Sequence, residues 1–150
     1  MGTREELGKG RKLAISRLKT APVVKGRRHW INYRELGVTA ASNGHMRAQV
    51  MTNDPGQAQA NDWHYHTCDL QFLLVLNGWL ELEIAGEGLV HLDKGDSIFL
   101  PGGTVHHEVD TSEDFELLEI SEPAEMGTVP CAAPPGALGL PTGPVAKAAK

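Results

Sequence analysis

The chain has 150 residues, enough for one domain with a hydrophobic core, and carries a formal net charge of −5. Its composition of 41% hydrophobic and 22% charged residues excludes wholesale disorder. No apolar run reaches about 18 residues, the length that spans a bilayer, so we expect no membrane segment. Because residues 1–19 lack the apolar stretch of a secretory signal, we expect a cytoplasmic protein.

Residues 1–28 form a basic N-terminal arm, with nine Lys and Arg against two Glu, whereas the remainder has five Lys and Arg against seventeen acidic residues. A basic arm can contact phosphates, but here it contains no aromatic residue and no nucleic-acid-binding motif. We therefore expect no nucleic-acid partner, and an arm that lies on its own acidic body or on a partner subunit. The apolar residues between Leu7 and Leu18 predict one short helix.

Residues 29–121 consist of short β-like runs separated by Gly, Pro, Asn and Asp, without a strong helical period. This pattern is typical of an all-β sandwich or barrel. The expected strands are His29–Glu35, Met46–Thr52, Asp62–Thr67, Gln71–Leu76, Trp79–Ala85, Gly88–Leu92, Ser97–Leu100, Val105–Val109 and Glu113–Ile120.

Asn77-Gly78 is the sharpest turn signal in this region. A two-residue type I′ hairpin needs positive φ at both central positions, and Asn-Gly accepts this conformation most readily. The dipeptide therefore predicts a hairpin that joins Gln71–Leu76 to Trp79–Ala85. In the second of these runs apolar and largely polar residues alternate, which indicates one buried face.

Residues 122–150 are rich in Pro, Ala and Gly and contain almost no large apolar side chains. We expect an extended or disordered C-terminal tail that contributes little to the fold. The sequence therefore predicts three parts: the arm 1–28, a β-barrel domain 29–121 and the tail 122–150.

Three histidines carry the chemistry of this sequence. His64 and His66 lie on one expected strand, where residues two apart point to the same face and can lean onto one ion. His106 follows a Pro-Gly-Gly turn on a later strand, from which the chain can fold back over the first pair. Three imidazoles of this kind form an open metal site with positions left for water and a substrate.

The residues after His106 divide between the two faces of its strand. His107 points to the opposite face and is expected at the surface or at an interface. Glu108 shares the phase of His106, so it is either a catalytic acid or base in the cavity or a carboxylate in solvent at the rim. Glu119 is a weaker candidate of the same kind, and it points inward only if Phe115 and Leu117 face the core.

Two segments resemble the sequence motifs of the cupin family. The first is His64-Tyr65-His66, followed by Gln71 and Gly78, and the second is Gly95, Pro101-Gly102-Gly103, His106 and Asp110. The resemblance covers about residues 29–121 and implies a double-stranded β-helix, also called a jelly-roll barrel, with an ion near its mouth. It also implies metal ligands at His64, His66, Gln71 and His106.

Gln71 departs from the family motif, which has Glu at this position; Asp110 likewise replaces a final Asn. A Gln ligand offers a neutral carbonyl oxygen, so the ion keeps more positive charge and is a stronger Lewis acid. Alternatively, Gln71 lies beside the site while three histidines hold the ion.

The resemblance implies a metal-binding enzyme, dioxygenase-like, that acts on a small oxygenated organic substrate. One alternative is a metal-dependent isomerase or lyase of sugar acids, because Gln at this position also occurs in cupins that rearrange unsaturated uronates. Another is a non-catalytic cupin that binds a small ligand. The cofactor is a divalent ion, and the sequence leaves Fe, Mn, Ni, Cu and Zn open. Since cupins commonly pair through their outer sheets, we expect a homodimer in which His29–Glu35 adds to a neighbour's sheet edge.

Overall fold

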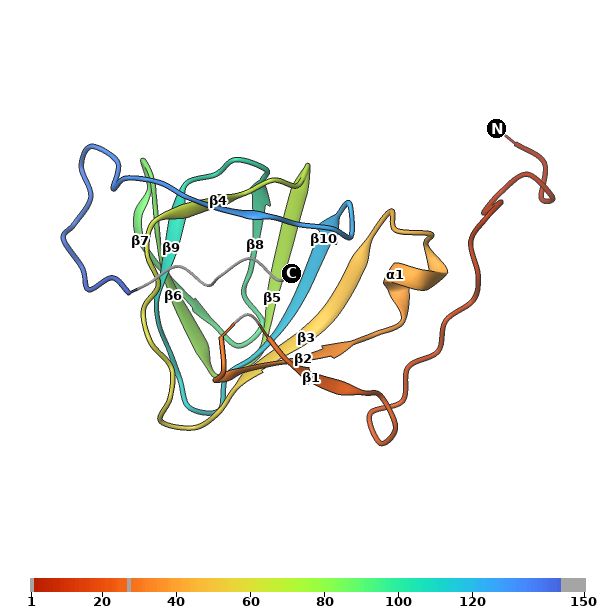
Figure 1. Cartoon of the computed structure of the whole chain (residues 1–150), viewed down its shortest axis with the longest axis horizontal. Helices are drawn as coiled ribbons and strands as arrows, with labels where there is room; N and C mark the ends of the chain where they lie inside the picture. The colour runs from red at the N-terminus through yellow and green to blue at the C-terminus, as the bar shows by residue number, and fades with distance from the viewer. Residues whose placement is uncertain (1, 27, 144–150) are drawn as a thin grey trace.

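The computed structural model describes residues 2–26 and 28–143, and its strands form two antiparallel sheets that face each other (Figure 1). In spatial order, the six-stranded sheet contains β1 (Val23–Lys25), β2 (Ile31–Glu35), β3 (Arg47–Asn53), β10 (Glu116–Glu122), β5 (Leu70–Asn77) and β8 (Ser97–Pro101). The five-stranded sheet contains β11 (Thr128–Pro130), β4 (His64–His66), β9 (His106–Thr111), β6 (Trp79–Ile84) and β7 (Gly88–Asp93). One short helix, α1 (Val38–Ala41), precedes β3.

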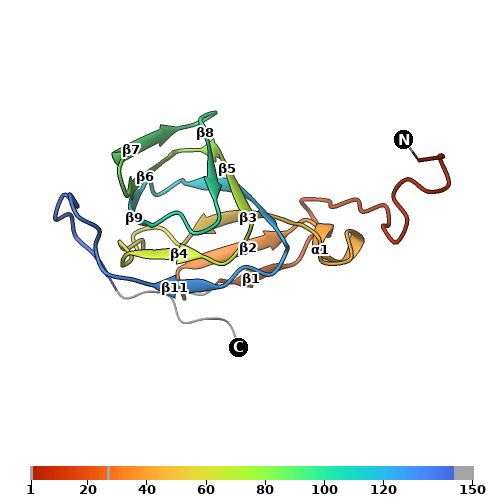
Figure 2. The same cartoon turned by 90° about the horizontal axis from the view of Figure 1, so that it is seen from above.

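The predicted all-β class is confirmed, and every expected strand forms with ends shifted by at most three residues. The strands, however, extend beyond the expected 29–121 range at both ends. β1 lies within the segment interpreted as an arm, and β11 lies within the expected tail. Figure 2 shows both of these strands beside the rest of the barrel.

Alternation along the strands places a hydrophobic core between the sheets. Leu82 is completely buried, and its neighbours in this core come from both sheets. The cluster consists of Leu73, Val75, Leu80, Leu82, Ile84, Leu92, Leu100, Phe115 and Leu117. These residues close one end of the interior and leave the other end for polar side chains.

The predicted hairpin at Asn77-Gly78 is wrong. β5 and β6 belong to different sheets, so the dipeptide carries the chain from one sheet to the other. Positive φ occurs at Gly78 (67°) and not at Asn77. Tertiary contacts select this turn, because the Asn77 side chain donates to the Asp114 carbonyl at 2.9 Å and a Cβ at Gly78 would lie 1.9 Å from Ser112 Oγ.

The short helix predicted between Leu7 and Leu18 is also wrong. Gly8 and Gly10 have φ values of 68° and 78°, which interrupt a right-handed helix. The segment extends away from the barrel (Figure 1), and Leu13 is 88% exposed. Its apolar side chains therefore gain no packing that would favour a helix. Within residues 2–26 and 28–143, no helix is long and apolar enough to cross a membrane.

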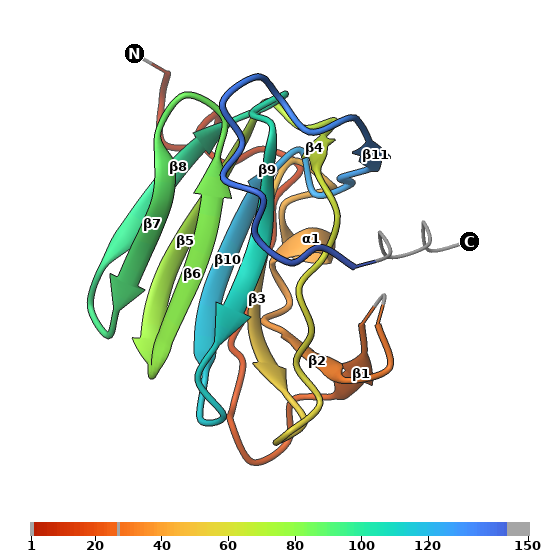
Figure 3. The same ribbon diagram turned by 90° about the vertical axis from the view of Figure 1, so that its left-hand side faces the viewer.

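The C-terminal segment contributes more to the fold than its composition predicted. β11 pairs with β4, and the chain after β11 then crosses the outer side of β9 and β6 (Figure 3). Ala124 and Met126 are buried, and the Leu138 N–H donates to Glu83 Oε2 at 2.8 Å. Backbone pairing and a few hydrogen bonds thus order a segment that lacks large apolar residues.

A surface histidine on β7 gives the first testable prediction. His91 lies between the carboxylates of Glu81 and Asp93, each 3.0 Å from a ring nitrogen, and these hydrogen bonds raise its pKa. A raised folded-state pKa stabilises the protein at low pH, and this stabilisation disappears as pH rises through that pKa. We expect His91→Gln to lower the unfolding free energy more at pH 5.5 than at pH 8.5.

Urea denaturation of the metal-free protein at both pH values measures this difference. His45→Gln is the control, because His45 is exposed in the loop before β3. An equal loss of stability at the two pH values would contradict the predicted pH dependence.

Candidate metal centre

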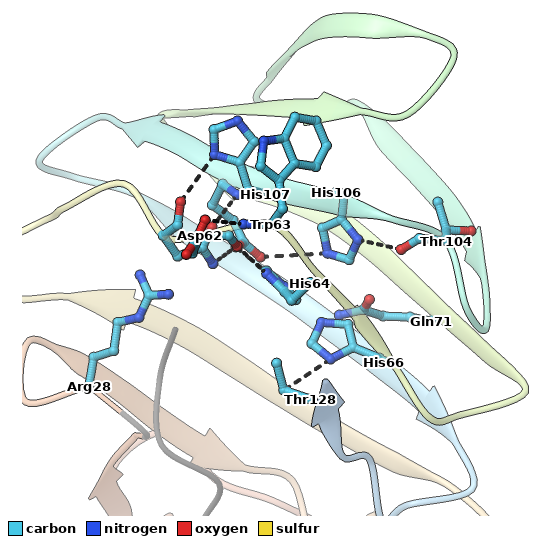
Figure 4. Close-up of polar contacts among 12 residues, drawn as sticks. Arg28, Asp62, Trp63, His64, His66, Gln71, Thr104, His106, His107 and Thr128 are labelled. Carbon is cyan, nitrogen blue, oxygen red and sulfur yellow. Dashed lines mark hydrogen bonds and ion pairs between the residues drawn. The ribbon is translucent and has the colours of Figure 1, made fainter. Parts of the chain in front are cut away.

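The three candidate histidines meet inside the barrel, as predicted. His64 and His66 come from β4, and His106 comes from β9, where it is the register partner of His64. One ring nitrogen from each of them lies within 4.8 Å of the others, and all three side chains are buried. Figure 4 shows the rings pointing toward one another. A single divalent ion can bond to all three nitrogens.

Backbone carbonyls fix the tautomer of each ring. A carbonyl oxygen only accepts hydrogen bonds, so the facing Nδ1 must carry the proton and Nε2 keeps its lone pair. The Nδ1 contacts are His64 to Asp62 O at 2.7 Å, His106 to Thr104 O at 2.8 Å, and His66 to Gly127 O at 3.3 Å. His66 Nδ1 also lies 3.1 Å from the Thr128 hydroxyl, which can accept the same proton. This arrangement fits a metal, because three Nε2 lone pairs converge where a cation would accept them.

Burial also favours the neutral, metal-binding form of the third ring. His106 is 2% exposed, and this burial lowers the pKa of His106 below its ordinary value. A neutral imidazole is the form that binds a metal, so burial favours the metal-binding form of this ring.

Glu108 faces the triad from β9, as its phase with His106 predicted. One carboxylate oxygen lies 3.8 Å from His64 Nε2 and the other lies 4.0 Å from His106 Nε2. Burial alone would raise the pKa of Glu108, but the neighbouring histidines lower this pKa to about 2. The group is therefore a carboxylate at neutral pH, adjacent to the position of an ion.

Asn61 holds Glu108 in place, and sequence reasoning missed this residue. Its side-chain carbonyl accepts the Glu108 N–H at 2.6 Å, its amide donates to Glu108 Oε2, and its own N–H donates to the Glu108 carbonyl at 3.0 Å. Asn61 is 5% exposed. It lies in the loop before β4, where no periodic pattern marks the residue as inward-facing.

The prediction that His107 lies at the surface or an interface is wrong, since its side chain is completely buried. It points away from the triad and packs against Trp63, and the C-terminal segment crosses the outer side of its strand, β9 (Figure 3). Nδ1 faces Asn61 O at 3.1 Å and Nε2 faces Glu83 Oε1 at 3.2 Å. Both ring nitrogens of His107 therefore face hydrogen-bond acceptors.

A cavity of about 120 Å³ opens beside the triad between the two sheets. Its inner wall is apolar and includes Leu73, Leu117 and Phe115, whereas its polar wall includes His64, His66 and Glu108. The combination is typical of a site for a small organic molecule, in which apolar walls limit water and a few polar groups orient the ligand.

Comparison with known proteins places this arrangement in a family. The model of the cupin domain matches residues 49–121, a segment that contains all three histidines. These residues form a cupin domain. No curated protein matches the chain by sequence.

Solved structures share the fold of this cupin domain. KdgF from Halomonas sp. is 20% identical with a TM-score of 0.61, and the match covers 76% of this chain and 96% of that one. The polyketide cyclase RemF from Streptomyces resistomycificus is 16% identical with a TM-score of 0.65, covering 83% and 89%. An RmlC-like cupin from Shewanella frigidimarina is 19% identical with a TM-score of 0.57, covering 76% and 94%.

Gln71 lies next to His66 in the cupin domain, with its side chain 4% exposed (Figure 4). Its amide nitrogen donates to Glu119 Oε2 at 2.7 Å, and Gln49 donates to Glu119 Oε1 at the same distance. The inward orientation expected for Glu119 is therefore present, although this carboxylate is engaged by two amides. Because Gln71 uses its nitrogen in this way, its carbonyl oxygen is the atom left to reach an ion.

Proposed function

We propose that this cupin is a metal-dependent enzyme that transfers a proton on a small oxygenated substrate. The observation that carries the proposal is the Glu108 carboxylate, 3.8 and 4.0 Å from two ring nitrogens of the triad. The proposed ligands are His64, His66 and His106, with Gln71 as the fourth candidate. The ion is one of Fe, Mn, Ni, Cu and Zn, all of which imidazole ligands accommodate.

A divalent ion held by these residues would polarise a substrate carbonyl or hydroxyl and make a neighbouring C–H more acidic. Glu108 then accepts the proton at Oε1, the oxygen that does not accept the Asn61 amide. Asn61 keeps the carboxylate aimed at the reacting carbon, and the apolar wall limits competing water. Return of the proton to a different atom of the substrate completes an isomerisation or a ring closure or opening.

Oxidative cleavage by a dioxygenase, which the sequence favoured, is the rival reaction. An open histidine site suits both chemistries, but a clamped carboxylate beside the ion supports proton transfer directly. Among the fold neighbours, RemF is named as a polyketide cyclase and OxdC from Bacillus subtilis as an oxalate decarboxylase. The fold thus accommodates several reactions, and the choice rests on the site.

Glu108→Gln tests the proposal. Metal-loaded protein in D₂O is mixed with β-diketones, phenolic acids and unsaturated uronates, and hydrogen exchange and turnover are followed by NMR alongside oxygen consumption. Since a positioned general base contributes about 10²- to 10⁴-fold, we expect Glu108→Gln to slow exchange by that factor while its metal content stays unchanged.

Glu113→Gln provides the matched control, because Glu113 is exposed in the loop before β10. Turnover accompanied by stoichiometric oxygen consumption would contradict proton transfer and favour the dioxygenase. Binding without exchange or turnover would favour the non-catalytic alternative.

We also infer that two copies of the chain pair through the six-stranded sheet. β2 lies between β1 and β3, so the expectation that His29–Glu35 adds to a neighbour's sheet edge is wrong. β1 is the end strand of the sheet, and its Val23 and Val24 are 60% and 56% exposed. An exposed apolar edge strand favours pairing with another chain, and β1 replaces β2 as the proposed contact.

A further inference from the structure

An arginine in the wall of the metal cavity has no counter-charge. Arg47 begins β3 and lines the same cavity as His64 and His66, in phase with Gln49. Its Nε is buried without a hydrogen-bond partner. No carboxylate within residues 2–26 and 28–143 forms an ion pair with it. A guanidinium is charged at every physiological pH, so an unpaired one in a cavity wall is unfavourable.

The nearest inward carboxylate by register does not neutralise Arg47. In the β3–β10 ladder Gln49 is opposite Glu119, and Arg47 is one inward position further along, opposite Ser121. Both oxygens of Glu119 accept hydrogen bonds from the amides of Gln49 and Gln71, each at 2.7 Å. These amides direct the Glu119 carboxylate toward themselves, which leaves the guanidinium for another acceptor.

The second arginine of the cavity is occupied differently. Arg28 donates to the Gln59 carbonyl at 3.3 Å, and its guanidinium carbon lies 5.4 Å from the centre of the Trp30 ring. Its charge also acts on Glu108, whose pKa it helps to lower. Arg28 is thus tied to protein groups near Glu108, whereas Arg47 is available to a ligand.

We propose that the small molecule bound at the metal centre carries a carboxylate that pairs with Arg47, while other oxygens of the molecule face the ion. This inference rests on the proposed function and names its substrate class. The planar guanidinium matches a carboxylate with two parallel hydrogen bonds. The charge of the neighbouring Glu119 disfavours a doubly charged phosphate and favours a singly charged carboxylate.

Succinate and monomethyl succinate test the proposal, because the ion attracts one carboxylate of either probe and only succinate has a second carboxylate left for Arg47. Isothermal titration calorimetry measures both ligands with Mn²⁺-loaded wild type, Arg47→Gln and Arg34→Gln. Arg34 lies on β2 and does not line the cavity, so Arg34→Gln is a matched control. Since a charge-assisted pair contributes about tenfold or more in affinity, we expect wild type and Arg34→Gln to prefer succinate by that factor.

The Arg47→Gln variant is expected to bind the two probes equally, with its metal content unchanged. A retained succinate preference in this variant, or the absence of a preference in wild type, would overturn the proposal. Thermal melting checks the fold of the variant. If Arg47→Gln does not fold, Arg47→Lys replaces it, since lysine keeps the charge and loses the planar fork. We expect Arg47→Lys to show a reduced preference for succinate. An unchanged preference would contradict the inference.

Repeating the titrations on metal-free protein separates this inference from the proposed function. Succinate binding that depends on Arg47, but is no tighter with Mn²⁺ than without it, supports the carboxylate contact and counts against the ion as the second anchor. Binding that tightens with Mn²⁺ and does not depend on Arg47 supports the metal centre and rejects the carboxylate contact.

Discussion

Loss of bound metal is the expected result of replacing His106 by alanine. Its ring is buried between those of His64 and His66, and Thr104 fixes the tautomer that directs Nε2 to the ion. Changes to groups that only orient metal ligands already lower affinity about 10- to 100-fold. Removal of a ligand is therefore expected to reduce metal content by at least about tenfold. Elemental analysis of protein purified from metal-supplemented medium measures the change.

His45→Ala is the control for this experiment, since His45 is exposed outside the cavity. The triad does not hold the ion if His64→Ala, His66→Ala and His106→Ala all keep the metal content of the wild type. The metal content that remains in each single variant, where two of the three nitrogens are still present, also ranks the histidines by their contribution to metal affinity.

A large loss of stability is expected when Glu83 is replaced by alanine. The Glu83 side chain is 3% exposed, lies 3.2 Å from His107 Nε2 and also accepts the Leu138 N–H. Its removal leaves Nε2 of the buried His107 ring and the Leu138 N–H without their hydrogen-bond partner. Each buried group left without a hydrogen-bond partner costs about 1–3 kcal/mol, so the two together cost about 2–6 kcal/mol and lower the melting temperature by roughly 4 to 24 °C in a domain of this size.

Calorimetry of the metal-free protein measures this effect separately from metal binding. Glu87→Ala is the matched control, because Glu87 is exposed in the turn between β6 and β7 and is expected to change stability by less than about 0.5 kcal/mol. Equal melting temperatures for the two variants would show that the buried pair contributes nothing to stability.

The features that the sequence predicted well are local ones. Alternation and turn residues located the strands, and the two-residue spacing placed His64 and His66 on one face. The third candidate ligand was found because His106 follows a turn on another strand, in a pattern that resembles a second cupin motif. The phase of Glu108 with His106 left two positions open for its carboxylate, in the cavity or in solvent at the rim, and the structure places it facing the triad.

The features that the sequence did not predict depend on tertiary contacts. Strand phase showed that His107 points away from the triad, but not that Trp63 packs against it and that the C-terminal segment crosses the outer side of β9 (Figure 3). Asn77-Gly78 correctly predicted a turn. The turn is not a hairpin because β5 and β6 pair with strands of different sheets, which the dipeptide does not determine. Asn61 lies in a loop, where no period indicates which residues contact Glu108.

The hydrogen bond from His66 to Gly127 has a consequence for any shortened version of this protein. The recognisable family segment stops at residue 121, whereas the acceptor that orients this ligand comes six residues later and is carried by a segment that pairs with β4. A fragment trimmed to residues 49–121 therefore lacks a structural support of its own candidate metal centre. Residues with no family signature complete the site that the signature defines.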